Sequence, residues 1–217
     1  MLYMIKDGVA PRLCEFVKNG GILISGFMSG YVDSDALCCT GGFPGAGLLR
    51  LFGLHNEEID TLYPEHKNRI LFGDNEYEVF DYCEIIHPDT AEVLAKYKED
   101  FYAGNPAMTV NSCGSGKAYY IACRTDERFI ERFYSEITAN IRLAKAEIHF
   151  PKGLSVRTRE NDTAVYCFVQ NWNDNSVRIT LKSEFKNVDT GIRLKGEISL
   201  DKYETLILKQ MKAGYVD

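Results

Sequence analysis

The sequence lacks any uninterrupted run of about 18 apolar residues, so no segment is long enough to cross a bilayer as a helix. Its start, residues 1–7, turns polar too early for a signal peptide. It also lacks an excess of positive charge, since 25 Lys and Arg stand against 31 Asp and Glu, a net charge of −6. A nucleic acid or an anionic membrane would require a clustered positive surface. We therefore expect a cytoplasmic protein that binds neither nucleic acid nor membrane.

Patterns typical of metal or redox sites are missing as well. The seven cysteines are odd in number and show no repeated C-x-x-C spacing, and the four histidines show no H-x-x-x-H pair. Cys38 and Cys39 are adjacent, which would strain a disulfide between them. We interpret all seven cysteines as reduced, small, buried apolar side chains, and we expect no metal and no cofactor.

The 217 residues are 45% hydrophobic, enough for one full domain or two modest ones, and the pattern changes near residue 150. In the first part, residues 2–5 predict a strand. Val9, Leu13, Phe16 and Val17 follow with helical spacing, and the apolar run 22–27 predicts a strand buried on both faces. Strand, helix and buried strand in this order predict a βαβ unit with a parallel sheet.

Further strands are predicted over 76–86, 92–97, 106–111 and 118–123. A helix is expected to begin at Thr125 or Asp126, and its core stripe has a spacing of four: Phe129, Phe133, Ile137 and Ile141. From residue 154 onward only strands are predicted, over 154–159, 163–170, 176–182, 192–200 and 203–209. Short strands separated by polar turns predict a small antiparallel sandwich.

Two glycine-rich segments, 41–45 and 114–117, superficially match phosphate-binding loops. The first lacks the Lys-Ser/Thr ending of a P-loop, and the second lies between predicted strands instead of opening a helix. We interpret both as turns. Cys113 has Asn111 at the position where a nucleophile elbow needs Gly, so it is not predicted to be a catalytic nucleophile.

Acidic side chains are numerous, but no pair stands out as the two carboxyl groups of a glycosidase. Glu57, Glu58 and Asp60 are interpreted as a solvated face, not as a calcium site. Trp172 is either a platform that stacks on a sugar or, the interpretation we favour, a turn residue that packs on its own sheet. The residues alone therefore assign no catalytic, cofactor-binding or metal-binding position.

Five stretches together resemble one protein family. They are 16–24 (FVKNGGILI), 29–33 (SGYVD), 41–45 (GGFPG), 100–107 (DFYAGNPA) and 111–120 (NSCGSGKAYY). In this order and spacing they are similar to the region that follows the catalytic barrel in glycoside hydrolase family 42 β-galactosidases. The similarity extends over about residues 1–210.

The resemblance implies a fold and a domain organisation. Residues 1–148 would form an amidotransferase-like (flavodoxin-like) α/β trimerisation domain, with a mostly parallel sheet, flanking helices and its first elements missing. Residues 149–217 would form a small antiparallel C-terminal β-domain. The family's two catalytic glutamates lie in an N-terminal barrel, and no position of this chain matches either of them.

These implications lead to the expected function: the oligomerisation and C-terminal part of a retaining β-galactosidase that hydrolyses terminal non-reducing β-D-galactosides. Its partners would be two further copies in a homotrimer and the barrel of the parent enzyme, and the chain alone would be inactive. The alternative is a free-standing small-molecule (sugar) binding or sensing domain, with its ligand near Ser29, Gly30, Gly41 and Gly42. A missing first strand would also expose a sheet edge and favour higher association.

Overall fold

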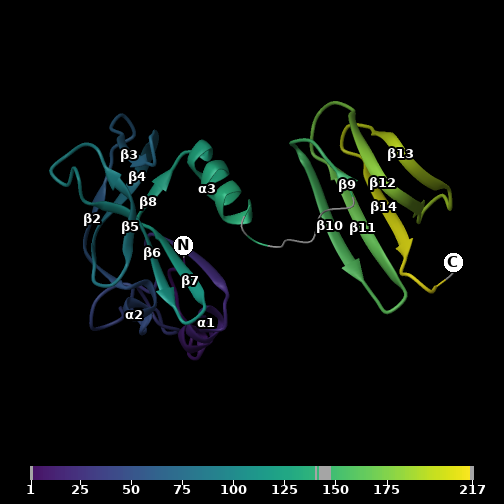
Figure 1. The fold of residues 1–217 in the computed structure, drawn as a ribbon. Helices are drawn as coiled ribbons and strands as arrows, with labels where there is room; N and C mark the ends of the chain where they lie inside the picture. Colours follow the sequence, from purple (N-terminus) through teal and green to yellow (C-terminus); the bar gives the residue numbers. More distant parts are fainter. Residues whose placement is uncertain (1, 140, 142–147, 216–217) are drawn as a thin grey trace. The chain divides into compact units, whose positions relative to one another are not determined.

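A computed structural model describes residues 2–139, 141 and 148–215 (Figure 1). The chain divides into two compact units, Met1–Ile141 and Arg142–Asp217. Each unit has its own hydrophobic core, and each is described by itself. The expected domain boundary between residues 148 and 149 stays a prediction.

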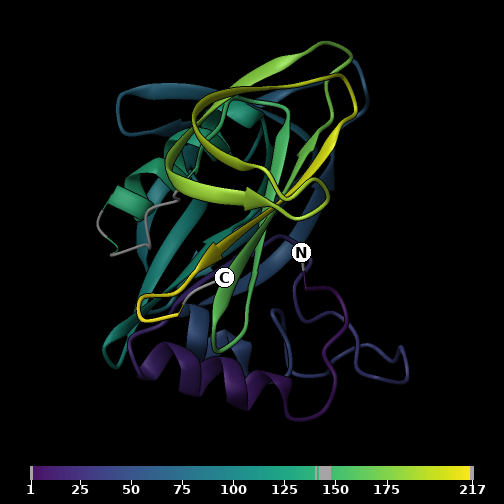
Figure 2. The same cartoon turned by 90° about the vertical axis from the view of Figure 1, so that its right-hand side faces the viewer.

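The first unit contains a mixed sheet and three helices. Its elements are α1 (Val9–Lys18), β1 (Ile22–Gly26), α2 (Leu48–Phe52), β2 (Leu54–Thr61), β3 (Asn68–Phe72), β4 (Asn75–Pro88), β5 (Glu92–Tyr97), β6 (Pro106–Cys113), β7 (Gly116–Ile121), β8 (Cys123–Thr125) and α3 (Glu127–Ala139). The strand order is β1-β7-β6-β5-β3-β4-β2, and β8 pairs with β4. In Figures 1 and 2, α1 and α2 lie on the far side of this unit from α3.

The prediction of a mostly parallel sheet is wrong. Among the described strands of this unit, β1 and β7 pair in parallel and the other pairs are antiparallel. The connections explain the difference, because β3 to β4 and β6 to β7 are joined by two residues each, and parallel neighbours need a crossover of a dozen or more. Strands β2 and β3 were not predicted. Half of the residues of β2 are exposed and show no clear alternation, and β3 is only five residues long.

Two expectations for the N-terminal region are also corrected. Residues 2–5 form no strand; within them only Met4 makes an isolated bridge, to Val32. The strand predicted over 22–27 exists as β1, but Ile22, Leu23 and Ile24 are only partly buried. The reason is that β1 is the last strand in the sheet order, so it has a strand neighbour on one side alone among the described residues.

Successive residues of the sheet point to two different cores. Ala118 and Tyr120 of β7 belong to the core formed with α1 and α2, whereas Tyr119 and Ile121 face the core formed with α3. The predicted stripe of α3 is confirmed, since Phe129, Phe133 and Ile137 are buried and Ile141 packs partly against them. Asp126 caps this helix through its Oδ1, which accepts a hydrogen bond from the Phe129 N–H at 2.9 Å.

The second unit is an antiparallel β structure, as predicted. Its strands are β9 (Ile148–His149), β10 (Leu154–Glu160), β11 (Ala164–Asn171), β12 (Val177–Asn187), β13 (Arg193–Leu200) and β14 (Thr205–Met211). They pair in the order β10-β11-β14-β12-β13, with β9 on β12. Alternate residues such as Cys167, Val169, Leu206 and Leu208 face its core. In the described part of the chain, every helix is too short or too polar to cross a membrane.

Candidate assembly surface

The segment between β1 and α2, residues 27–47, forms an irregular surface of the first unit. An isolated bridge between Met4 and Val32 ties it to the N-terminal residues, and a second bridge, between Val32 and Cys38, lies within the segment. The Tyr31 N–H also donates to the Tyr3 carbonyl at 3.0 Å. These contacts place the N-terminal residues beside the segment, which also bridges to Asn56 of β2 through Phe43.

Two glycines of the family-like motifs allow this segment to fold back on itself. The Gly45 N–H donates to the Gly30 carbonyl at 2.9 Å. A Cβ atom on Gly30 would lie 2.7 Å from the Gly45 nitrogen, and Gly30 has a φ of +69°. Both features exclude a larger side chain. The segment 41–45 therefore serves a close backbone crossing, in agreement with its interpretation as a turn.

A stack of aromatic rings lies on this segment. The Tyr31 ring lies 4.1 Å from the Phe43 ring and 5.9 Å from the Tyr3 ring, centroid to centroid, with both pairs close to parallel. Leu37 is 64% exposed, and Tyr3 and Met4 are about 40% exposed. We call Tyr3, Met4, Tyr31, Leu37 and Phe43 the assembly surface. The rings of Tyr3, Tyr31 and Phe43 contact one another, and exposed apolar groups of this kind mark interaction sites.

Beneath the assembly surface lies a buried carboxylate, Glu84 of β4. Its Oε1 accepts hydrogen bonds from the Met28 N–H at 2.8 Å and the Tyr31 hydroxyl at 3.2 Å. Its Oε2 accepts one from the Tyr120 hydroxyl at 2.7 Å. Burial raises the pKa of Glu84 above its ordinary value, and the three hydrogen bonds oppose that rise. Glu84 thus joins β4, β7 and the 27–47 segment at one point.

The phenols around Glu84 are perturbed in the same direction. Burial, followed by the charge of Glu84, raises the pKa of both Tyr31 and Tyr120. Both hydroxyls therefore stay protonated and act as donors to the carboxylate. Asn56 Nδ2 in turn donates to the Tyr31 oxygen at 2.8 Å, which extends the network to β2.

The polar groups near Ser29 are bonded to one another. The Ser25 and Ser29 hydroxyls lie 2.8 Å apart, and the Ser29 hydroxyl donates to the Gly26 carbonyl at 2.6 Å. Ser29 is fully buried. A binding site needs convergent polar groups that face a ligand, so this pairing lends no support to the alternative of a ligand near Ser29, Gly30, Gly41 and Gly42.

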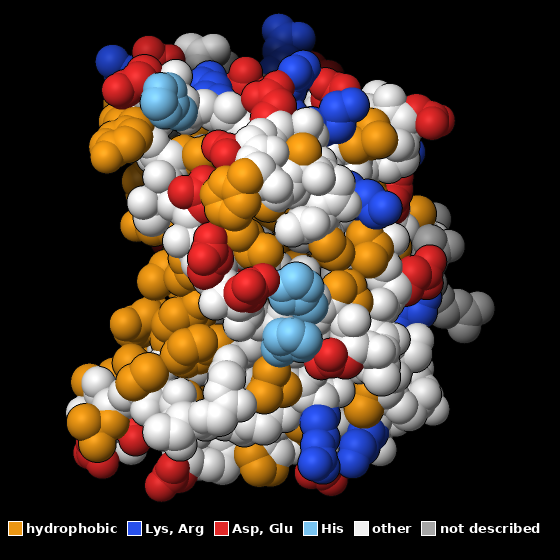
Figure 3. Space-filling model, turned by 90° about the vertical axis from the view of Figure 1, so that its left-hand side faces the viewer, with side chains coloured by type: hydrophobic (Ala, Val, Ile, Leu, Met, Phe, Trp, Pro, Cys, Tyr) orange, Lys and Arg blue, Asp and Glu red, His pale blue; other side chains and the backbone are white. Residues whose placement is uncertain are grey.

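The structure pairs two histidines that are 32 positions apart in the sequence. His55 on β2 lies opposite His87 on β4, and their rings stack at 5.2 Å. His55 Nδ1 lies 3.1 Å from an Asp89 oxygen, and His87 Nε2 lies 2.6 Å from a Glu57 oxygen. Figure 3 shows two adjacent histidines beside acidic side chains, with hydrophobic side chains gathered along one margin of that face.

These side chains do not form a metal site. The described residues contain no group of three or more His, Cys, Asp or Glu side chains arranged to hold a metal ion. The three acidic residues 57, 58 and 60 differ in their surroundings. Glu57 and Glu58 are exposed, whereas the Asp60 carboxylate accepts a hydrogen bond from the buried Tyr102 at 2.8 Å. The interpretation of a solvated face is therefore correct for the two glutamates only.

Cys113 and the neighbouring glycines form a hairpin, as predicted. Cys113 ends β6, Gly116 begins β7, and the two residues pair across the turn. All seven cysteines are free, but the prediction that all are buried is wrong. Cys83, Cys123 and Cys167 are buried, whereas Cys38 is exposed and the other three are partly exposed. Cys38 and Cys39 lie in the irregular 27–47 segment, which has no regular alternation of buried and exposed side chains.

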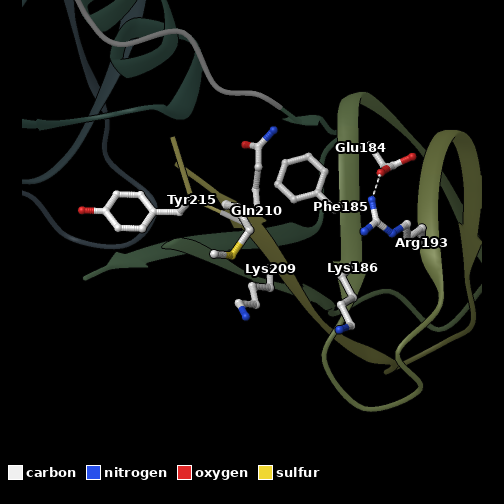
Figure 4. Close-up of a pocket in the computed structure, with 8 residues that line it drawn as sticks. Glu184, Phe185, Lys186, Arg193, Lys209, Gln210 and Tyr215 are labelled. Atoms are coloured by element: carbon white, nitrogen blue, oxygen red, sulfur yellow. Dashed lines mark hydrogen bonds and ion pairs between the residues drawn. The ribbon is translucent and has the colours of Figure 1, made fainter. Parts of the chain in front are cut away.

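Trp172 does not pack on its own sheet, which corrects the interpretation that we favoured. It follows the last residue of β11 and is 66% exposed. The second unit also has a shallow cavity of about 340 Å³ between β12, β13 and β14 (Figure 4). Phe185 and Tyr215 line it together with Lys209, and Arg193 pairs with Glu184 at 2.6 Å.

Comparison with known proteins matches both units. Residues 1–144 match the family "Beta-galactosidase trimerisation domain", and residues 153–210 match "Beta-galactosidase C-terminal domain". The two matched units thus define the class, a trimerisation domain followed by a C-terminal domain of the β-galactosidase type. The chain belongs to the β-galactosidases of glycoside hydrolase family 42.

Individual relatives give the same result. The chain is 39% identical to β-galactosidase Pbg of Clostridium perfringens and 35% identical to β-galactosidase GanA of Bacillus subtilis, over 97% and 96% of its length. It superposes on Gan42B, a GH42 β-galactosidase from G. stearothermophilus, with a TM-score of 0.86 and 36% identity over 98% of the chain. The chain spans only 31–32% of the length of these relatives.

Proposed function

We propose that this chain is the self-association and C-terminal part of a β-galactosidase, and that it assembles as a homotrimer. The observation that carries the proposal is the match of residues 1–144 to the trimerisation domain. The exposed apolar side chains of the assembly surface support it, because monomeric proteins rarely leave such groups contiguous and exposed.

The activity of the whole protein is proposed from its relatives, which are β-galactosidases. It would hydrolyse terminal non-reducing β-D-galactosides in carbohydrate metabolism, with its catalytic glutamates in a barrel outside this chain. The chain alone would be inactive and would have the barrel as a partner. The test is a chromogenic β-galactoside: turnover by the isolated chain at an enzyme-like rate would contradict the proposal.

The remaining parts of the proposal concern fold and compartment. An amidotransferase-like fold is proposed for the complete first domain, supported by the parallel pairing of β1 with β7 and the packing of α1 beside them. A cytoplasmic location without nucleic-acid or membrane partners is supported by the acidic net charge and by seven free thiols, which are typical of a reducing compartment.

The decisive experiment for assembly is the solution mass, measured by light scattering over a range of concentrations. We expect a stable species of about 74 kDa, three times the 24.6 kDa of the chain. A trimer would mean that these two units suffice for assembly. A monomer at every concentration would contradict self-association through the first unit.

A further inference from the structure

Two exposed aromatic side chains of the second unit have no role in the proposed function. Trp172 is 66% exposed and Tyr203 is 63% exposed. Trp172 is also the only tryptophan of the sequence. Large rings left in water at turns, where they support no core, are the kind of group that interaction sites use.

The strand register brings both rings to the same end of the sheet. Gln170 of β11 pairs with Thr205 of β14, and the Asn171 N–H donates to the Glu204 carbonyl at 2.9 Å. Trp172 directly follows β11, and Tyr203 lies in the turn that ends just before β14 begins at Thr205. Both residues therefore lie just beyond the same end of this ladder.

The loops that bear the rings are held together by one buried amide. Asn171 is 2% exposed, and its Nδ2 donates to the carbonyls of Asn175 at 2.9 Å and Asp201 at 2.8 Å. Its Oδ1 accepts from both the backbone N–H and the side-chain amide of Asn173, at 3.0 and 2.9 Å. These intramolecular bonds fix the backbone of the loops that bear both rings, which reduces the entropy lost on binding.

Polar side chains surround the two rings. Asp174, Asn175 and Ser176 are exposed on the loop after Trp172, and the Ser176 hydroxyl lies 3.1 Å from an oxygen of Asp201, two residues before Tyr203. This combination of apolar ring faces with hydroxyl, amide and carboxylate groups suits a ligand that has an apolar face and a rim of hydroxyls. A pyranose sugar has both, whereas an apolar peptide segment would leave these polar groups unpaired.

We propose that Trp172 and Tyr203 form a saccharide-binding platform, on which the rings stack against the apolar faces of pyranose units. A preference for β-galactosides over other pyranosides rests on the proposed function. The stacking itself rests only on the geometry of the second unit.

The single tryptophan makes the test specific. We expect lactose to shift the Trp172 fluorescence to shorter wavelength, with saturation in the millimolar range, and sorbitol, a polyol without a pyranose ring, to leave it unchanged. A response to cellobiose alone would support the platform while removing the galactoside preference. Absence of a response to both disaccharides, or an equal response to sorbitol, would overturn the platform.

Variants separate stacking from general effects. Tyr203→Ala should raise the lactose concentration needed for half-saturation about tenfold. Tyr203→Phe keeps the aromatic ring, so its half-saturation concentration should equal that of the unchanged chain. The matched control is Tyr63→Ala, because Tyr63 is 69% exposed in the first unit and should have no effect. The solution mass of Trp172→Ala should equal that of the unchanged chain; a lower mass would mean that another copy covers the ring and would overturn the proposal.

Discussion

Glu84 illustrates how single buried groups organise this molecule. Its carboxylate receives three hydrogen bonds from β7 and from the segment that follows β1. None of these contacts involves residues close to it in the sequence, so their effect is to hold the assembly surface against the sheet. Buried donors and acceptors of this kind are costly when one partner is removed.

Glu84→Gln tests the charge of this group. Burial raises the folded-state pKa of Glu84 above its unfolded value near 4.5. The folded state therefore binds the proton more tightly, and the stability contribution is complete below about pH 4.5 and is lost as pH rises toward the folded pKa. We expect the unfolding free energy of the unchanged chain, relative to Glu84→Gln, to fall between pH 4.5 and neutral pH in urea titrations. A difference that stays constant or grows with pH would refute this.

Gly116 is a second key residue, because the backbone around it leaves no room for a side chain. A Cβ atom there would lie 2.1 Å from the Val17 carbonyl oxygen and 2.3 Å from that of Gly21. Gly116→Ala should therefore destabilise the first unit by about 3 kcal/mol, measured by urea unfolding. Gly73→Ala is the control, because Gly73 has a φ of +59° with nothing near its Cβ position, and should cost only about 1 kcal/mol. Equal effects would contradict the steric explanation.

Helix α3 shows what an amphipathic element contributes. Asp126 begins it by capping the Phe129 N–H, and Phe129 and Phe133 stack at 5.9 Å on the sheet. Its apolar stripe could be predicted from the sequence, because a spacing of four places side chains on one helix face whatever that face packs against. The strands that α3 packs against could not be predicted in this way.

Phe133→Ala measures the packing of α3. Phe133 is 2% exposed, and its ring packs edge to face with Phe72 and Tyr119 of the sheet. We expect the substitution to lower the unfolding free energy by about 3 to 5 kcal/mol, because it leaves a cavity. Tyr134→Ala, at a neighbouring position that is 45% exposed, should cost under about 1 kcal/mol. Similar losses in circular-dichroism unfolding curves would argue against the assigned helix face.

For the whole molecule, the question is which surface joins the subunits. The family match covers the first unit, and the assembly surface there exposes Tyr3, Met4 and Leu37. Sheet strand β1 also ends the strand order, so the higher association expected of an exposed edge stays a prediction.

Leu37→Asp tests the assembly surface. A carboxylate buried in an apolar subunit contact loses hydration and has no partner, so the solution mass should fall from about 74 kDa toward the 24.6 kDa of one chain. Ile192→Asp is the control, since Ile192 is similarly exposed, at 60%, in the second unit. If both variants keep the trimer mass, the subunits meet elsewhere.

The sequence by itself determined the features that depend on neighbours along the chain. The presence of α1, the core face of α3, the hairpin after Cys113 and the main strands of the second unit follow from local spacing and turn residues. The face of α1 was predicted only in part, because Phe16 is 51% exposed. The family motifs were recognisable for the same reason, since they consist of short segments in order.

Only the tertiary structure decided the rest. It paired His55 with His87, brought Tyr31 and Tyr120 to Glu84, made most of the first sheet antiparallel and left Trp172 in water. Each of these depends on the register between segments that are distant in sequence. A shift of one residue in a strand reverses every side chain, and no local pattern carries that information.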